Sequence, residues 1–161
     1  MKMSARPATY RRSVAVVLAP YLLCCAVFLT VLLVLRDRLP DPVATHFTGG
    51  GRADGHTSLG ALPYVALGLL VVPGAVLTAC AVALNGGRAG GKPGVRPVTA
   101  LAYGVAGLLA VLLTGLLVVN ARAASAEDAR LPLGALFAAL AVAVAAAGVG
   151  ALVAGREKPT A

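Results

Sequence analysis

Residues 13–35 read SVAVVLAPYLLCCAVFLTVLLVL, a run of 23 residues without a charged side chain. Three more uncharged runs, 24, 22 and 22 residues long, follow at residues 61–84, 98–119 and 133–154. A helix of about 20 apolar residues crosses the hydrocarbon core of a bilayer, which is about 30 Å thick. Each run is therefore long enough to span a membrane, and a span must be helical because lipid offers the backbone no hydrogen-bonding partner.

These four runs predict an all-α membrane protein, a bundle of four transmembrane helices. We expect a single membrane domain over residues 1–161, with an ordered outer loop at residues 36–60 between helices 1 and 2. A cleavable signal peptide has an apolar segment of only about 7–15 residues. The first run is longer than that, so we expect it to stay in the protein as the first span.

The composition agrees with a membrane protein. Apolar residues make up 59% of the chain and charged residues 12%, whereas a soluble domain carries about 25% charged residues. The net charge of +8 does not indicate nucleic-acid binding, because the basic residues flank the apolar runs and form no basic-aromatic stripe. The partner that the sequence predicts is the lipid bilayer.

The distribution of Lys and Arg predicts the orientation, because cytoplasmic loops are enriched in these residues. With the N-terminus inside, nine Lys and Arg residues lie on the inner side and five on the outer side. The inner set includes the glycine-rich connector at residues 85–97. Arg outnumbers Lys and Ala is abundant, as is typical of bacteria with GC-rich genomes. We therefore expect a multi-pass protein of the bacterial plasma membrane with both termini in the cytoplasm.

The outer loop contains the stretch LPDPVATHFTGGGRADGHTS at residues 39–58. Two prolines favour an extended start, and residues 43–47 have the composition of a strand. The glycines at 49–51 allow the chain to reverse. We expect this stretch to fold back on itself and to form a cap on the outer ends of helices 1 and 2.

The same stretch resembles the motif of a bacterial membrane family called domain of unknown function 1648. The motif positions in this sequence are Leu39, Pro40, His46, Phe47, Gly51, Asp54 and Ser58. The family usually has a proline two residues before the histidine, where this chain has Ala44. The resemblance covers about 20 residues and the layout of the following helix. It implies a similarity to the N-terminal part of Sdp-type immunity proteins, which protect a cell from its own peptide toxin.

The polar residues of the loop allow several interpretations. His46, His56, Asp41 and Asp54 could together bind a metal ion, since imidazole and carboxylate suit zinc. The nine residues between the two histidines do not match a recognised ligand spacing, so we expect no metal and no cofactor. We expect instead that His46 docks the loop onto the helix ends by hydrogen bonds and that Phe47 packs at the lipid boundary. His46 could pair with Asp54, or each could bond a backbone group.

Three function classes remain from the sequence. The leading hypothesis is a small non-enzymatic membrane protein of the bacterial cell envelope that binds a peptide or protein through its outer loop, as in toxin immunity. The alternative is a small oligomeric transporter or channel component, although no ionisable side chain lies in the spans except Tyr and Cys. The third is a metal-dependent membrane enzyme. We expect no enzyme, because the loop has no nucleophile next to a base and the chain has no nucleotide-binding motif.

Overall fold

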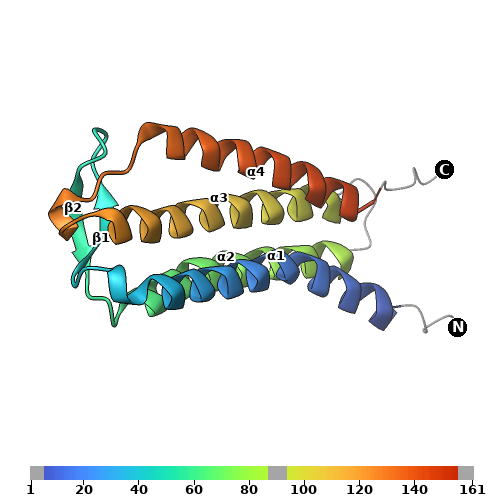
Figure 1. Ribbon diagram of the computed structural model, residues 1–161. Helices are drawn as coiled ribbons and strands as arrows, with labels where there is room; N and C mark the ends of the chain where they lie inside the picture. The colour runs from blue at the N-terminus through green and yellow to red at the C-terminus, as the bar shows by residue number, and fades with distance from the viewer. Residues whose placement is uncertain (1–5, 87–93, 156–161) are drawn as a thin grey trace, which may run out of the picture.

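The computed structural model describes residues 6–86 and 94–155, and within them four long helices run side by side as a bundle (Figure 1). Their bounds are α1 Arg6–Leu35, α2 Leu62–Gly86, α3 Val95–Arg122 and α4 Leu133–Val153. All four are long and apolar enough to cross a membrane. The predicted four-helix fold is confirmed. The glycine-rich connector predicted at residues 85–97 lies mostly outside the described residues.

A small antiparallel hairpin separates α1 from α2. It follows the short 3-10 helix η1 (Arg36–Arg38) and consists of β1 (Val43–Phe47) and β2 (Ala53–Thr57). The strand predicted at residues 43–47 is therefore confirmed. The turn is closed by the amide of Thr48, which donates to the carbonyl of Arg52 at 2.8 Å. A second 3-10 helix, η2 (Ala126–Asp128), lies between α3 and α4.

The main core lies between α1, α2 and α3. Its largest fully buried apolar side chains are Phe28, Leu70, Leu117 and Val17 from these helices and Val43 from β1. Val43 belongs to the same cluster as the helix residues, as does Leu39. The start of the hairpin is therefore part of the helical core and not a separate unit.

Helix α4 packs along α3 through small residues. A Cβ atom added to Gly104 of α3 would lie 3.2 Å from the carbonyl oxygen of Ala143, and one added to Gly150 of α4 would lie 2.7 Å from that of Thr99. Such spacing lets the backbones of two membrane helices approach closely. The small residues noted at every fourth position of α4 contribute to this contact: Ala139 is fully buried, and Ala147 contacts Gly104.

The outward faces of the helices are apolar. Exposed side chains include Leu33 and Val34 of α1, Val72 of α2, and Phe137 and Val144 of α4, each more than 60% exposed. Water would solvate such a surface poorly, whereas lipid chains are as apolar as these side chains. The bundle is thus suited to a bilayer on all sides, with the hairpin at one end.

Candidate functional site

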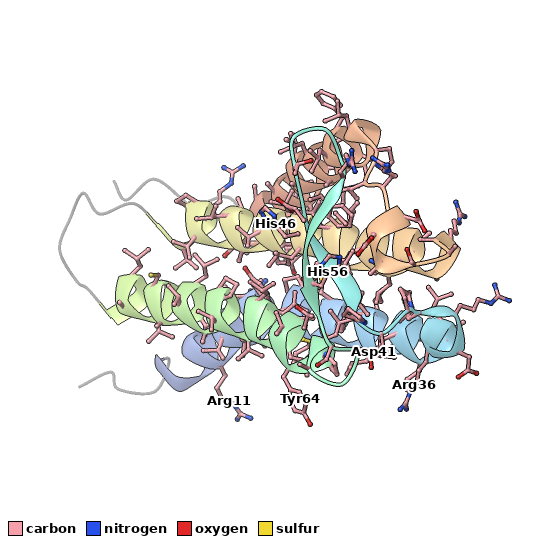
Figure 2. All side chains as sticks on the ribbon, turned by 90° about the vertical axis from the view of Figure 1, so that its left-hand side faces the viewer. Arg11, Arg36, Asp41, His46, His56 and Tyr64 are labelled. Carbon is pink, nitrogen blue, oxygen red and sulfur yellow. The ribbon has the colours of Figure 1, made fainter. Side chains whose placement is uncertain are left out.

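The hairpin lies across one end of the bundle, with its tip towards α4 (Figure 2). Its strongest attachment is a side chain that sequence reasoning did not select, Asn120 near the end of α3. The amide oxygen of Asn120 accepts a hydrogen bond from the N–H of Ala44 at 2.8 Å, and its nitrogen donates to the carbonyl of Ala44 at 2.9 Å. The same nitrogen donates to the carbonyl of Leu116, also at 2.9 Å. Asn120 is fully buried, and this two-way bond satisfies the backbone of β1 as a neighbouring strand would.

The residue at position 44 matters for this contact. Proline has no backbone N–H to donate, so a proline in place of Ala44 would lose the bond to the Asn120 oxygen. Ala44 and Asn120 form a matched pair 76 residues apart.

A second attachment holds the tip of the hairpin to the connection between α3 and α4. Arg52 and Arg130 form an antiparallel bridge, and the amide of Leu131 donates to the carbonyl of Gly51 at 2.9 Å. Gly51 has φ +78, and a Cβ atom there would lie 2.4 Å from the carbonyl oxygen of Leu131. Only glycine fits at this position, because the left-handed backbone and the close approach both exclude a side chain.

These two attachments correct the expected position of the cap. We expected it on the ends of helices 1 and 2, whereas Asn120 and the segment at Arg130 and Leu131 hold it to α3 and to the α3–α4 connection. The base of the hairpin is held by Leu39 and Val43, which belong to the core cluster formed by α1, α2 and α3.

The predicted motif residues at the two ends of the loop have local structural roles. Leu39 is buried in the core and Pro40 is half-buried beside it. The hydroxyl of Ser58 accepts a hydrogen bond from the amide of Ala61 at 3.3 Å, just before α2 begins. Such a bond is typical of residues that initiate a helix.

His46 and Asp54 form a direct pair. The Nδ1 atom of His46 and a carboxylate oxygen of Asp54 are 2.6 Å apart, on side chains that are 75% and 43% exposed. Gly55 makes room for the first carbon of the His46 side chain, since a Cβ atom at position 55 would lie 2.8 Å from the Cβ of His46. Of the two alternatives left open by the sequence, the structure shows the direct pair. The pair joins the two strands to each other, so the expectation that His46 docks the loop onto the helix ends is wrong.

His56 lies apart from this pair. It borders an open hollow of about 500 Å³ that is also lined by Asp41 and Glu127, and Asp41 accepts a hydrogen bond from the amide of Leu59 at 3.0 Å. Within residues 6–86 and 94–155, no three His, Cys, Asp or Glu side chains come together as metal ligands would. The four residues considered for a metal site thus lie in two places, His46 with Asp54 and His56 with Asp41.

Phe47 lines a groove between the hairpin, α3 and α4. The groove has a volume of about 340 Å³, within the range of ligand pockets. Its walls are mainly apolar. The hairpin contributes the polar part of the lining, which consists of two threonine hydroxyls and one imidazole. The lining leucines are Leu112, Leu116, Leu131, Leu133 and Leu136, and the polar side chains are those of Thr45, His46 and Thr48.

Comparison of the chain with protein-family models, curated proteins and solved structures found no match. The candidate site therefore rests on its own geometry. It consists of a hairpin that is attached at two points, at β1 by Asn120 of α3 and at its turn by Leu131 of the α3–α4 connection. The exposed His46–Asp54 pair lies on its surface, and an apolar groove lies beneath its tip.

Proposed function

We propose that this four-span membrane protein is a small non-enzymatic component of the bacterial cell envelope that recognises a peptide or protein at the face where the hairpin lies. The observation that carries the proposal is the double attachment of the hairpin through Asn120 and Leu131. A surface loop that is held in one conformation loses little entropy on binding a partner. The hairpin thus offers a preformed surface that includes the exposed residues His46, Asp54 and His56.

Peptide-toxin immunity is the form of recognition that the motif resemblance supports. The motif residues His46, Gly51, Asp54 and Ser58 shape the hairpin and its exit into α2, as described above. Their contribution is to fold an extramembrane surface, which a recognition protein needs. The resemblance itself is an analogy of fold to function, so the proposal is tested in cells.

The test is protection of the bacterium that produces the chain. Deletion of its gene should make the cells sensitive to the spent medium of the parent strain, and expression of the wild-type chain should restore growth. Asn120→Leu should fail to protect, because it releases the hairpin. Thr30→Val is the matched control: it removes only a hydroxyl that donates to the Ala26 carbonyl of its own helix at 2.8 Å. Cells that grow equally well in spent medium with and without the gene would refute immunity.

The orientation is part of the proposal. Positive-inside counting places the hairpin outside the cell. In a variant in which Cys24, Cys25 and Cys80 are replaced, Gly50→Cys should react with an impermeant thiol reagent on intact cells and Gly90→Cys should not. Gly50 is exposed and has room for a side chain, since the nearest heavy atom to an added Cβ is 3.9 Å away. Labelling at Gly90 alone, or equal labelling at both positions, would contradict this orientation.

The alternative class, a small oligomeric transporter or channel component, needs polar groups along a shared path. The threonine hydroxyls of the described spans instead donate to carbonyls of their own helices. These are Thr30 to Ala26, Thr78 to Gly74, Thr99 to Val95 and Thr114 to Ala110. Such back-bonding satisfies a hydroxyl locally, so these four residues do not favour transport over recognition.

A further inference from the structure

The apolar groove beneath the hairpin extends along the end of α3 that lies nearest the hairpin. On α3 its lining extends from Leu116 to Leu112. Leu112 precedes Leu116 by four residues, which is about 6 Å along a helix at about 1.5 Å per residue. One leaflet of the hydrocarbon core is about 15 Å deep. The α3 part of the lining therefore covers less than half the depth of one leaflet, and the hairpin residues Thr45, His46 and Thr48 continue the lining towards the end of the bundle.

The groove is continuous with the surface that faces lipid. Leu133 and Leu136 of α4 line it and are also 59% and 42% exposed, and the neighbouring Phe137 is 71% exposed. Figure 1 shows why a groove forms here: α4 lies close to α3 at the end remote from the hairpin and diverges from it towards the hairpin. The close end is the one where Gly150 lies against Thr99. A lipid chain can therefore enter the groove sideways from the bilayer.

We propose that this groove binds one acyl chain of a phospholipid from the leaflet on the hairpin side. The chain would lie against Phe47 and the five leucines, and the ester and phosphate groups would reach Thr45, His46 and Thr48. His46 uses Nδ1 to contact Asp54, so Nε2 is the ring nitrogen that meets a lipid oxygen. The inference does not depend on the partner proposed above, because the leucines of the groove would hold the acyl chain; His46 is the residue that both proposals use.

An acyl chain fits the groove better than a peptide does. A peptide backbone carries N–H and C=O groups that need partners when they leave water. The hairpin cannot supply these partners at its attachment points. The N–H and C=O of Ala44 already bond Asn120, and the C=O of Gly51 already accepts from the N–H of Leu131. An acyl chain has no polar group along its length and leaves nothing unpaired against leucine side chains.

The experiment is native mass spectrometry of the delipidated full-length protein titrated with palmitoyl-oleoyl phosphatidylglycerol in detergent. We expect one lipid to bind to the wild-type chain. Leu136→Trp and the milder Leu116→Phe fill the groove and should weaken binding about tenfold, since exclusion of two or three methylene groups is enough for that change. Leu140→Trp is the matched control on α4, because Leu140 is 55% exposed and does not line the groove. Circular dichroism shows whether each variant keeps its helices.

Equal lipid binding by the wild type, Leu136→Trp, Leu116→Phe and Leu140→Trp would overturn the proposal, since it would show only the non-specific lipid that coats any span. A wild-type chain that binds no lipid, or that carries a peptide lost in Leu136→Trp, would also overturn it. Oleic acid, titrated in parallel, distinguishes the source of the chain. Weaker binding of oleic acid than of the phospholipid supports the proposed headgroup contacts, and equal binding refutes them.

Discussion

The outer and inner faces of the hairpin carry two polar contacts that differ in their surroundings. On the outer face, His46 and Asp54 are 2.6 Å apart, but their side chains are 75% and 43% exposed to solvent. On the inner face, Asn120 bonds the backbone of Ala44 at 2.8 and 2.9 Å, and both residues are fully buried. The His46–Asp54 contact is shorter and involves a carboxylate, but it is exposed to water. The Asn120–Ala44 contact is longer, but it is shielded from water.

Burial decides which of these contacts holds the hairpin. An exposed ion pair contributes about 0–1 kcal/mol, because water solvates both groups equally well when they separate. A buried backbone group that loses its partner costs about 1–3 kcal/mol. Asn120 satisfies two such groups on Ala44. The neutral amide, and not the His–Asp pair, therefore carries the attachment of the hairpin to the bundle.

The largest effect is expected for Asn120→Leu. This change leaves the N–H and the C=O of Ala44 buried without a partner and should lower the free energy of unfolding by about 2–6 kcal/mol. The measurement is thermal or denaturant unfolding in detergent. Thr114→Val is the control, since the Thr114 hydroxyl donates to carbonyls of its own helix, those of Ala110 and Val111. A loss as small as in the control would show that Asn120 does not anchor the hairpin.

A smaller loss is expected for Gly51→Ala at the second attachment. An added Cβ would lie 2.4 Å from the carbonyl oxygen of Leu131, on a backbone with φ +78. We expect a loss of about 1–3 kcal/mol, the usual cost of a strained backbone position. Gly50→Ala provides the matched control one residue away, where the nearest atom to the added Cβ is 3.9 Å distant. Equal stability of the two variants in the same unfolding assay would argue against the Gly51–Leu131 attachment.

The smallest effect is expected for His46→Ala. Removal of the exposed imidazole should change the free energy of unfolding by about 0–1 kcal/mol. Proteolysis of the hairpin in sealed vesicles should likewise remain as slow as in the wild type, because Asn120 still holds β1. If His46→Ala were cleaved as fast as Asn120→Leu, the His46–Asp54 pair would hold the hairpin as strongly as Asn120 does, which contradicts this expectation.

The sequence predicts the spans well because each depends on a local property. An uncharged run such as residues 13–35 specifies a helix in lipid without reference to the rest of the chain. The strand at Val43–Phe47 and the turn at Gly51 are equally local, since β composition and glycine are enough to indicate them. The sequence also allowed the direct His46–Asp54 pair as one of two alternatives. The pair could be foreseen because its two residues lie on neighbouring strands of a short hairpin.

The attachment of the hairpin could not be predicted in the same way. Asn120 lies directly after an apolar run, where a polar residue usually marks the boundary between a span and water. Its partner is a backbone 76 residues away, and a backbone carries no side-chain pattern for a sequence to reveal. The signal that was available is the residue type, since an amide is the side chain that can both donate to and accept from one peptide unit.

The most direct test of the buried attachment is amide hydrogen exchange at Ala44, followed by NMR on the labelled protein in micelles. The N–H of Ala44 donates to Asn120 and is fully buried, so we predict slow exchange in the wild type and in His46→Ala. In Asn120→Leu the same amide should exchange at least about tenfold faster, because local opening of the hairpin becomes easier. An Ala44 amide that exchanges equally slowly with and without Asn120 would contradict the account.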